Sequence, residues 1–219
     1  MNVIEESKLR VASILMDAFP TVMVPKYGEL FPCPTGKARF LMGRRGLFLE
    51  AVKPWGRIVT QLWECPRTQP LPYGEVEEQY SDFFKVLDAI EPIMRQEVIP
   101  RAAEYAKRDL EWAGWIVFDG EGLRFLSVDF EAWRAKAKVQ YPVLEKGWSL
   151  AVDIHSHGMI KAFFSSEDNE DDAGGVKICI VLGDYENRDG KPFFKSKTRF
   201  AVQGFFVDVK QETEGWFQS

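Results

Sequence analysis

The sequence has few cysteines and histidines, and it contains no long apolar run. Its 219 residues include three cysteines, Cys33, Cys65 and Cys179, which form no C-x-x-C pair. An odd and scattered set of this kind indicates neither a disulfide framework nor a cysteine-based zinc knuckle. No stretch approaches the roughly 20 apolar residues of a membrane-spanning helix, and the start, MNVIEESKLR, lacks the apolar core of a signal peptide. We therefore expect a cytoplasmic protein without a membrane span.

The composition is that of a globular protein with a substantial core. Hydrophobic residues make up 46% of the chain and aromatic residues 14%. The formal net charge of −5 argues against general binding of nucleic acids. Residues 1–60 are nevertheless locally basic. A solvated basic face explains this excess, and a docking surface for an acidic partner is the alternative.

The only two histidines, His155 and His157, stand two residues apart after an apolar run over residues 148–152. On a β-strand, side chains at i and i+2 point to the same face about 6–7 Å apart, so two imidazoles can converge on one cation. An H-x-H pair alone is more often ordinary polar surface than a metal site. Asp153 shares their face, where it would either orient one imidazole or carry a charge at the strand edge.

Two further polar residues follow the histidines at a fixed spacing. Ser165 and Asp168 complete the pattern H-x-H-G-x₆-S-x₂-D. This pattern resembles the motif of the JAMM (JAB1/MPN/Mov34) metallopeptidase family, H-x-H-P-x₆-S-x₂-D. The resemblance implies that His155, His157 and Asp168 bind Zn²⁺ and that Ser165 supports the transition state. Gly158 stands where the family usually has proline, which would loosen the backbone without removing a ligand.

A general base is expected upstream of the histidines, where helical periodicity gives way to a strand. Glu111 begins an E-x-x-G pattern that ends at Gly114 and leads into the apolar run Trp115–Phe118. A helix, E-x-x-G and a strand in this order resemble the start of JAMM domains, where the glutamate is the general base. Glu50 is the competing candidate. It lies on an expected strand, but no helix precedes it and no glycine follows at that spacing.

The order of helical and strand signals predicts two domains. Residues 1–74 form a β-rich unit and its linker, and residues 75–219 form the JAMM-like domain. Helical periodicity covers residues 75–112, with interruptions at Pro92 and Pro100. We predict an α/β (α+β) fold, in which a JAMM/cytidine-deaminase-like sheet is flanked by helices and preceded by the small β-rich unit.

Local patterns give more detailed expectations for each domain. In the first domain we expect a short helix over residues 5–18 and strands over residues 21–24, 38–42, 46–52 and 57–63. In the second we expect strands over residues 115–118, 123–128, 148–157, 176–182 and 198–209, a short helix over 130–137 and a polar loop over 183–197. The acidic run 167–172 is expected to be mostly a solvated loop, because like charges resist joint burial. Asp171 and Asp172 are candidates for supporting the ligands from behind.

The whole layout also resembles the protein A family of the bacterial ParB-related, ThiF-related cassette (PRTRC) system. The gene cassettes of that system also encode a ThiF/E1-like protein and a ubiquitin-like protein. The resemblance implies a zinc isopeptidase that cleaves an amide after the tail of a ubiquitin-like protein, with a ThiF/E1-like protein as a possible second partner. Two alternatives remain open: a zinc hydrolase of another amide, and a non-catalytic binding module.

Overall fold

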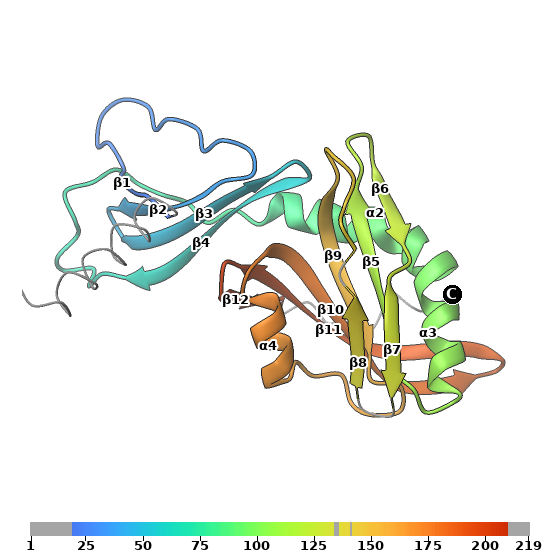
Figure 1. Ribbon diagram of the computed structural model, residues 1–219. Helices are drawn as coiled ribbons and strands as arrows, with labels where there is room; N and C mark the ends of the chain where they lie inside the picture. Colours follow the sequence, from blue (N-terminus) through green and yellow to red (C-terminus); the bar gives the residue numbers. More distant parts are fainter. Residues whose placement is uncertain (1–18, 134–135, 141, 210–219) are drawn as a thin grey trace, which may run out of the picture. The chain divides into compact units, whose positions relative to one another are not determined.

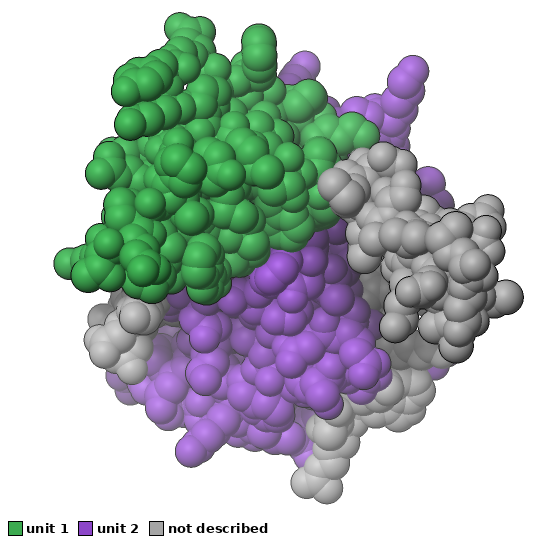
Figure 2. Space-filling view, turned by 90° about the vertical axis from the view of Figure 1, so that its left-hand side faces the viewer, with its two compact units in different colours: residues 1–84 green, residues 85–219 purple. Residues whose placement is uncertain are grey.

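The computed structural model describes residues 19–133, 136–140 and 142–209, so the helix expected over residues 5–18 lies outside the described residues. The chain consists of two compact units, residues 1–84 (unit 1) and 85–219 (unit 2), which are coloured separately in Figure 2. The boundary between the units at residue 84 lies ten residues after the boundary predicted from the sequence, residue 74. Within these ten residues, Gln79 exchanges two backbone hydrogen bonds of 2.9 Å with Val59 of unit 1. This segment therefore extends the strand pairing of unit 1.

Unit 1 is built on a four-stranded sheet with the order β1-β2-β3-β4 (Figure 1). Its strands are β1 (Thr21–Met23), β2 (Ala38–Gly43), β3 (Gly46–Lys53) and β4 (Gly56–Glu64). The β1–β2 pair is parallel and the other two pairs are antiparallel, as tight turns between consecutive strands allow. Leu41, Phe48 and Val59 are buried on one face of the sheet, with Val24 and Val76 packed beside them. The expected β-rich character of this unit is confirmed.

Unit 2 is built on a six-stranded mixed sheet with the order β12-β11-β10-β9-β5-β6. Only the β9–β10 pair is parallel among these neighbours, and the connection between them carries helix α4. In Figure 1 this sheet lies between α4 and α3. The elements are β5 (Trp112–Phe118), β6 (Leu123–Leu126), β9 (Ser149–Ser156), α4 (Ser166–Asp172), β10 (Val176–Arg188), β11 (Lys191–Val202) and β12 (Phe205–Asp208). The predicted α/β (α+β) class, with a sheet flanked by helices, is confirmed.

The helical segment before the sheet is continuous but changes its winding. It comprises α2 (Ser81–Ile93), a π-helical turn (Met94–Val98) and α3 (Ile99–Ala106). Pro92 lies inside α2, and Pro100 lies in the first turn of α3, where a missing N–H is tolerated. The helix ends at Ala106 and β5 begins at Trp112, so the helical region is shorter than residues 75–112 and the strand starts three residues before Trp115. No helix in the described residues is long and apolar enough to cross a membrane.

Three local predictions in unit 2 are wrong. Residues 130–137 are not a helix, because β7 (Asp129–Trp133) and β8 (Lys136–Gln140) pair as an antiparallel hairpin that sets Glu131 opposite Lys138. The expected loop over residues 183–197 is instead the outer half of the β10–β11 hairpin. Its exposed positions are polar, and they hid the strand pattern from sequence analysis. The third wrong prediction is the solvated loop over residues 167–172, which are part of helix α4.

The loop that leaves β9, residues 158–164, is bound closely to β10. The N–H groups of Asp184 and Tyr185 donate to the carbonyls of Ile160 and Gly158, at 2.8 and 3.0 Å. At the point of crossing, a Cβ on Gly183 would lie 2.3 Å from the Ala162 nitrogen and 2.5 Å from the Ile160 oxygen. Glycine is therefore required at residue 183 for two backbone segments to approach this closely.

Gly183→Ala is expected to lower the free energy of unfolding by about 1–3 kcal/mol, the usual cost of forcing an extra group into a packed site. The contacted atoms belong to the backbone and cannot rotate away. Urea denaturation measures the change, with Gly122→Ala as the control, because a Cβ at Gly122 meets nothing within 4 Å. Equal stability of the two variants would contradict this account of the crossing.

Candidate metal centre

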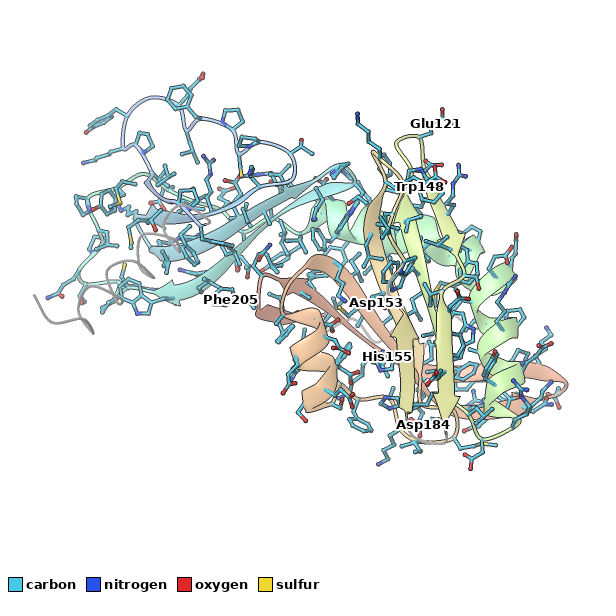
Figure 3. All side chains as sticks on the ribbon, in the orientation of Figure 1. Glu121, Trp148, Asp153, His155, Asp184 and Phe205 are labelled. Atoms are coloured by element: carbon cyan, nitrogen blue, oxygen red, sulfur yellow. The ribbon has the colours of Figure 1, made fainter. Side chains whose placement is uncertain are left out.

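Three side chains converge at the end of β9. The Nε2 atoms of His155 and His157 lie 3.2 Å apart, and His155 Nε2 lies 3.4 Å from Asp168 Oδ1. One ligand atom from each of the three residues falls within 4.8 Å of the others. Figure 3 shows His155 further along β9 than Asp153, towards the end of the sheet where Asp184 lies. One position in β9, the position just after it and one position in α4 thus supply donors that face a common point.

His157 is held in the orientation and charge state that a metal ligand needs. Its Nδ1 lies 3.1 Å from the carbonyl oxygen of Lys161, an acceptor that places the proton on Nδ1 and leaves the Nε2 lone pair free. Burial lowers the pKa of His157, and the neighbouring His155 lowers it further. The neutral imidazole is therefore favoured at neutral pH, and this is the form that binds a metal ion.

Asp168 is oriented by a helix cap. Ser165 is the N-cap of α4, and its hydroxyl accepts a hydrogen bond of 3.1 Å from the Asp168 N–H. In return, Asp168 Oδ2 accepts a 2.6 Å bond from the Ser165 N–H. This reciprocal arrangement is a capping box, in which the two side chains are always three residues apart. It explains the S-x₂-D spacing physically, and it leaves Asp168 Oδ1 facing the histidines.

Asp172, at the other end of α4, is buried and shared by two cations. Its oxygens accept bonds of 2.7 Å from Lys177 Nζ on β10 and 2.6 Å from Arg199 Nη2 on β11. Burial by itself would raise the pKa of Asp172, but Lys177 and Arg199 more than offset this and lower it. The expectation of a solvated acidic loop is thus wrong for Asp172, which supports the site from behind. Asp172 can be buried because it pairs with Lys177 and Arg199, whereas the prediction considered only the like charges of the acidic run.

Lys177 also binds Asp153, so that two carboxylates surround one ammonium group. Asp153 Oδ2 accepts from Lys177 Nζ at 2.6 Å, and Asp153 Oδ1 accepts from Trp115 Nε1 at 3.1 Å. Burial would lower the pKa of Lys177, but Asp153 and then Asp172 raise it well above its usual range. Both oxygens of Asp153 are therefore engaged away from the imidazoles. Asp153 is part of the ion-pair network and does not orient a histidine.

Arg199 fixes the first turn of α4 as well as its end. Its guanidinium donates to the Asp168 carbonyl at 3.2 Å and to Asn169 Oδ1. The rings of Phe164 and Phe206 lie 3.8 and 4.1 Å from its central carbon, and the side chain is almost completely buried. Arg199 therefore positions the backbone of the residue whose carboxylate faces the histidines.

Glu111 lies immediately before β5, next to the metal centre in register. Ala113 pairs with His155 and Trp112 with Ser156. Continued by one residue beyond both strands, this register would set Glu111 opposite His157. Strand alternation puts Glu111 on the same face of the sheet as the two histidines, because every second residue faces the same way. Glu111 is buried, as a carboxylate inside the site would be.

Gly114 in the E-x-x-G pattern makes room for a tryptophan on the opposite face of the sheet. A Cβ on Gly114 would lie 2.5 Å from the Trp112 ring, which stacks on Phe125 with centroids 6.1 Å apart. The glycine therefore leaves space for the Trp112 ring to pack against β5 and Phe125 at the start of this strand.

Glu50, the competing candidate for the base, is the centre of an ion-pair cluster in unit 1. Its two oxygens accept bonds of 2.6 Å each from Arg39 and Arg57, and only 1% of the residue is exposed. Both oxygens of Glu50 are therefore occupied by guanidinium groups, and neither is free to contact a water molecule. These contacts favour Glu111 as the base.

Gly158 has a backbone conformation that proline cannot adopt. Its φ angle is +57°, whereas the proline ring holds φ near −65°. Proline could not follow this loop path, in which the Gly158 carbonyl accepts a hydrogen bond from the Tyr185 N–H.

Sequence analysis missed Lys177 and Arg199, although one signal was visible. Lys177 interrupts an apolar run, V-K-I-C-I-V-L, that is typical of a buried strand, and a charge in such a run needs a buried partner. Arg199 offers no comparable signal, because its hydrogen-bonding partners lie 27 to 31 residues earlier in the chain.

The fold and the site together define the class of this protein. A mixed sheet flanked by helices, with two histidines and an aspartate at the end of a central strand, is consistent with a JAB-like domain. Residues 94–195 match the family described as prokaryotic homologs of the JAB domain, and this match supports a JAMM-like domain in unit 2. JAB domains usually bind zinc, and the histidine and aspartate donors of this centre suit that ion.

Residues 10–82 match a domain of unknown function, DUF2016, which coincides with most of unit 1. No curated protein matches the chain.

Asp172→Asn is expected to lower the free energy of unfolding by about 3–5 kcal/mol, because two buried cations then lose one shared charge. The pKa of Asp172 is lowered in the folded state, so its contribution is fully present above its ordinary pKa of about 4 and is lost as the pH falls further. Urea titrations at pH 7 and below pH 4 should show the gap to the parent protein narrowing in acid. Asp189→Asn, in an exposed turn, is the control.

Proposed function

We propose that the chain is a zinc metallopeptidase of the JAMM type that cleaves an amide bond after the tail of a ubiquitin-like protein. The observation that carries this proposal is the convergence of His155, His157 and Asp168. Hydrogen bonds hold His157 and Asp168 in ligating orientations. Ordinary surface histidines would not need the three supports found here: a fixed tautomer of His157, a capping box that orients Asp168, and the buried ion pairs of Asp172.

The three donors are one nitrogen from each histidine and one carboxylate oxygen, a set that fits catalytic zinc. Zinc held by three protein ligands supplies a Lewis acid and a bound water with a pKa near 7. Asp168 would bind through Oδ1, because Oδ2 is engaged by the Ser165 N–H. His157 would bind through Nε2, because Nδ1 is engaged by Lys161.

The remaining residues would handle protons and developing charge. Glu111 would accept the proton of the attacking water at its carboxylate and deliver it to the leaving amine. Ser165 already accepts a hydrogen bond at Oγ, and a hydroxyl that accepts can still donate its own proton to an oxyanion. Burial of Glu111 and His157 limits access of bulk water to the reacting groups.

The proposed substrate and setting rest on resemblance. The combination of an N-terminal DUF2016 region and a JAB-like domain is consistent with the PRTRC type of protein. On that basis, a ubiquitin-like protein is the proposed substrate and a ThiF/E1-like protein the proposed partner. The cleaved bond would follow the glycine at the end of the ubiquitin-like tail.

A second candidate is a non-catalytic, zinc-stabilised binding module. Engagement of Ser165 and Asp168 with each other favours it, because a capping box stabilises α4 whether or not catalysis occurs. The two candidates share the metal centre and differ in the role of Glu111.

The purified chain is expected to bind about one zinc ion per molecule, because a single set of His155, His157 and Asp168 is available. His155→Ala combined with His157→Ala should abolish binding, since one carboxylate cannot hold the ion alone. Elemental analysis after dialysis measures the metal content. Retention of stoichiometric zinc by the double variant would place the ligands elsewhere.

Glu111→Gln is expected to retain zinc while hydrolysis of a ubiquitin-like fusion falls by roughly 10²–10⁴-fold, the usual contribution of a positioned base. The amide keeps the shape of the carboxylate but cannot accept the proton. Glu121→Gln, in an exposed turn of the same unit, is the matched control and should be fully active. A parent protein that binds zinc and cleaves nothing would support the binding module instead.

A further inference from the structure

A pocket of about 540 Å³ opens beside the metal centre. Its wall contains three lysines, Lys161, Lys195 and Lys197, together with Phe163 and Asp184. The lysines come from two different elements: Lys161 from the loop after β9, and the other two from β11. All three are exposed, so their ammonium groups are accessible to a ligand.

The two lysines of β11 lie on the same face of the sheet as His155, and Lys197 is aligned with His155 across the strands. Val181 on β10 pairs with His155 on one side and with Lys197 on the other. Gly183 pairs with Lys195, two residues further along the same strands. Residues that pair across neighbouring strands face the same side of a sheet, so both lysines project on the side of the metal ligands.

The pocket and the metal centre have a common wall. The Phe163 ring lies edge-on to His157 with centroids 4.6 Å apart, and Phe163 also lines the pocket. Lys161 contributes to both places too, because its carbonyl accepts from His157 while its side chain lines the pocket. Anything bound over the histidines therefore lies next to this pocket.

The local charge is opposite to that of the whole chain. The lining has three cationic groups and one carboxylate, Asp184, while the chain has a formal net charge of −5. Glu186 is influenced by Lys195, but it is hydrogen-bonded at 2.7 Å to Arg188. Within the described part of the chain, none of the three lysines is within ion-pair distance of a carboxylate. Such unpaired cations attract an anionic ligand.

We propose that this pocket is a specificity subsite that receives an acidic side chain of the substrate; the inference rests on the function proposed above. Two strand spacings separate the backbones of His155 and Lys197, a distance of about 10 Å. About three residues of an extended peptide span the same distance. The substrate is thus a peptide segment with Asp or Glu two to three residues from the bond placed over the metal centre.

Binding of a fluorescein-labelled peptide, GSGEEGSG, tests the subsite directly, with GSGQQGSG as the neutral counterpart. Fluorescence anisotropy at low ionic strength should show the zinc-loaded full chain binding the Glu peptide about tenfold or more tightly than the Gln peptide. Lys195→Gln combined with Lys197→Gln should abolish this preference. Lys37→Gln combined with Lys146→Gln removes the same charge at exposed positions outside the pocket, so it should preserve the preference.

The inference is overturned if the parent protein binds both peptides equally, or neither, or if the control variant loses the preference to the same extent as the pocket variant. Because the assay contains no hydrolysis step, its outcome is independent of catalysis. A preserved preference in a chain that neither binds zinc nor cleaves a fusion would refute the proposed function alone. A lost preference in a chain that retains zinc and activity would refute the subsite alone.

Discussion

One buried carboxylate, Asp172, determines how helix α4 sits on the sheet of unit 2. It balances Lys177 and Arg199 from two adjacent strands, and the same two cations extend the network to Asp153 and to the backbone of Asp168. Two acids and two bases make the network neutral overall, so the cost of burying each charge is offset by its neighbours. Asp168 can face the histidines because Arg199 binds its helix at both ends, at the Asp168 carbonyl and at the Asp172 carboxylate.

Features that depend on short stretches of chain could be predicted from the sequence. The H-x-H pair follows from strand alternation, and the Ser165–Asp168 spacing follows from helix capping, so neither needs knowledge of the tertiary fold. The α/β class followed from periodicity in the same way. The hydrogen-bonding partners of Arg199 are distant in sequence and could not be predicted. Two local pairings were also missed, the outer half of the β10–β11 hairpin and the β7–β8 hairpin, because their polar residues do not give the apolar alternation expected of a strand.

The choice between Glu50 and Glu111 shows where sequence patterns lose their power. Both glutamates adjoin apolar residues, and sequence patterns separate them only by the helix before Glu111 and the glycine that follows it three residues later. What separates them is environment: two arginines pair with Glu50, whereas Glu111 directly precedes the end of β5 that pairs with the histidine-bearing end of β9. Neither arginine pairing nor strand register is encoded in a window of a few residues.

Backbone hydrogen bonds to β10 fix the path of the loop over residues 158–164, while several of its side chains face solvent. Its carbonyls accept from β10 and its path depends on the absence of a side chain at Gly183, while Met159, Ile160 and Phe163 are exposed. Backbone atoms therefore set the position of this loop, and its exposed side chains set the chemistry of its surface. Substitutions of Met159 and Ile160 can alter what the surface accepts while the Lys161 carbonyl that holds His157 stays in place. In evolutionary terms, recognition at this rim can diversify without disturbing the ligand geometry.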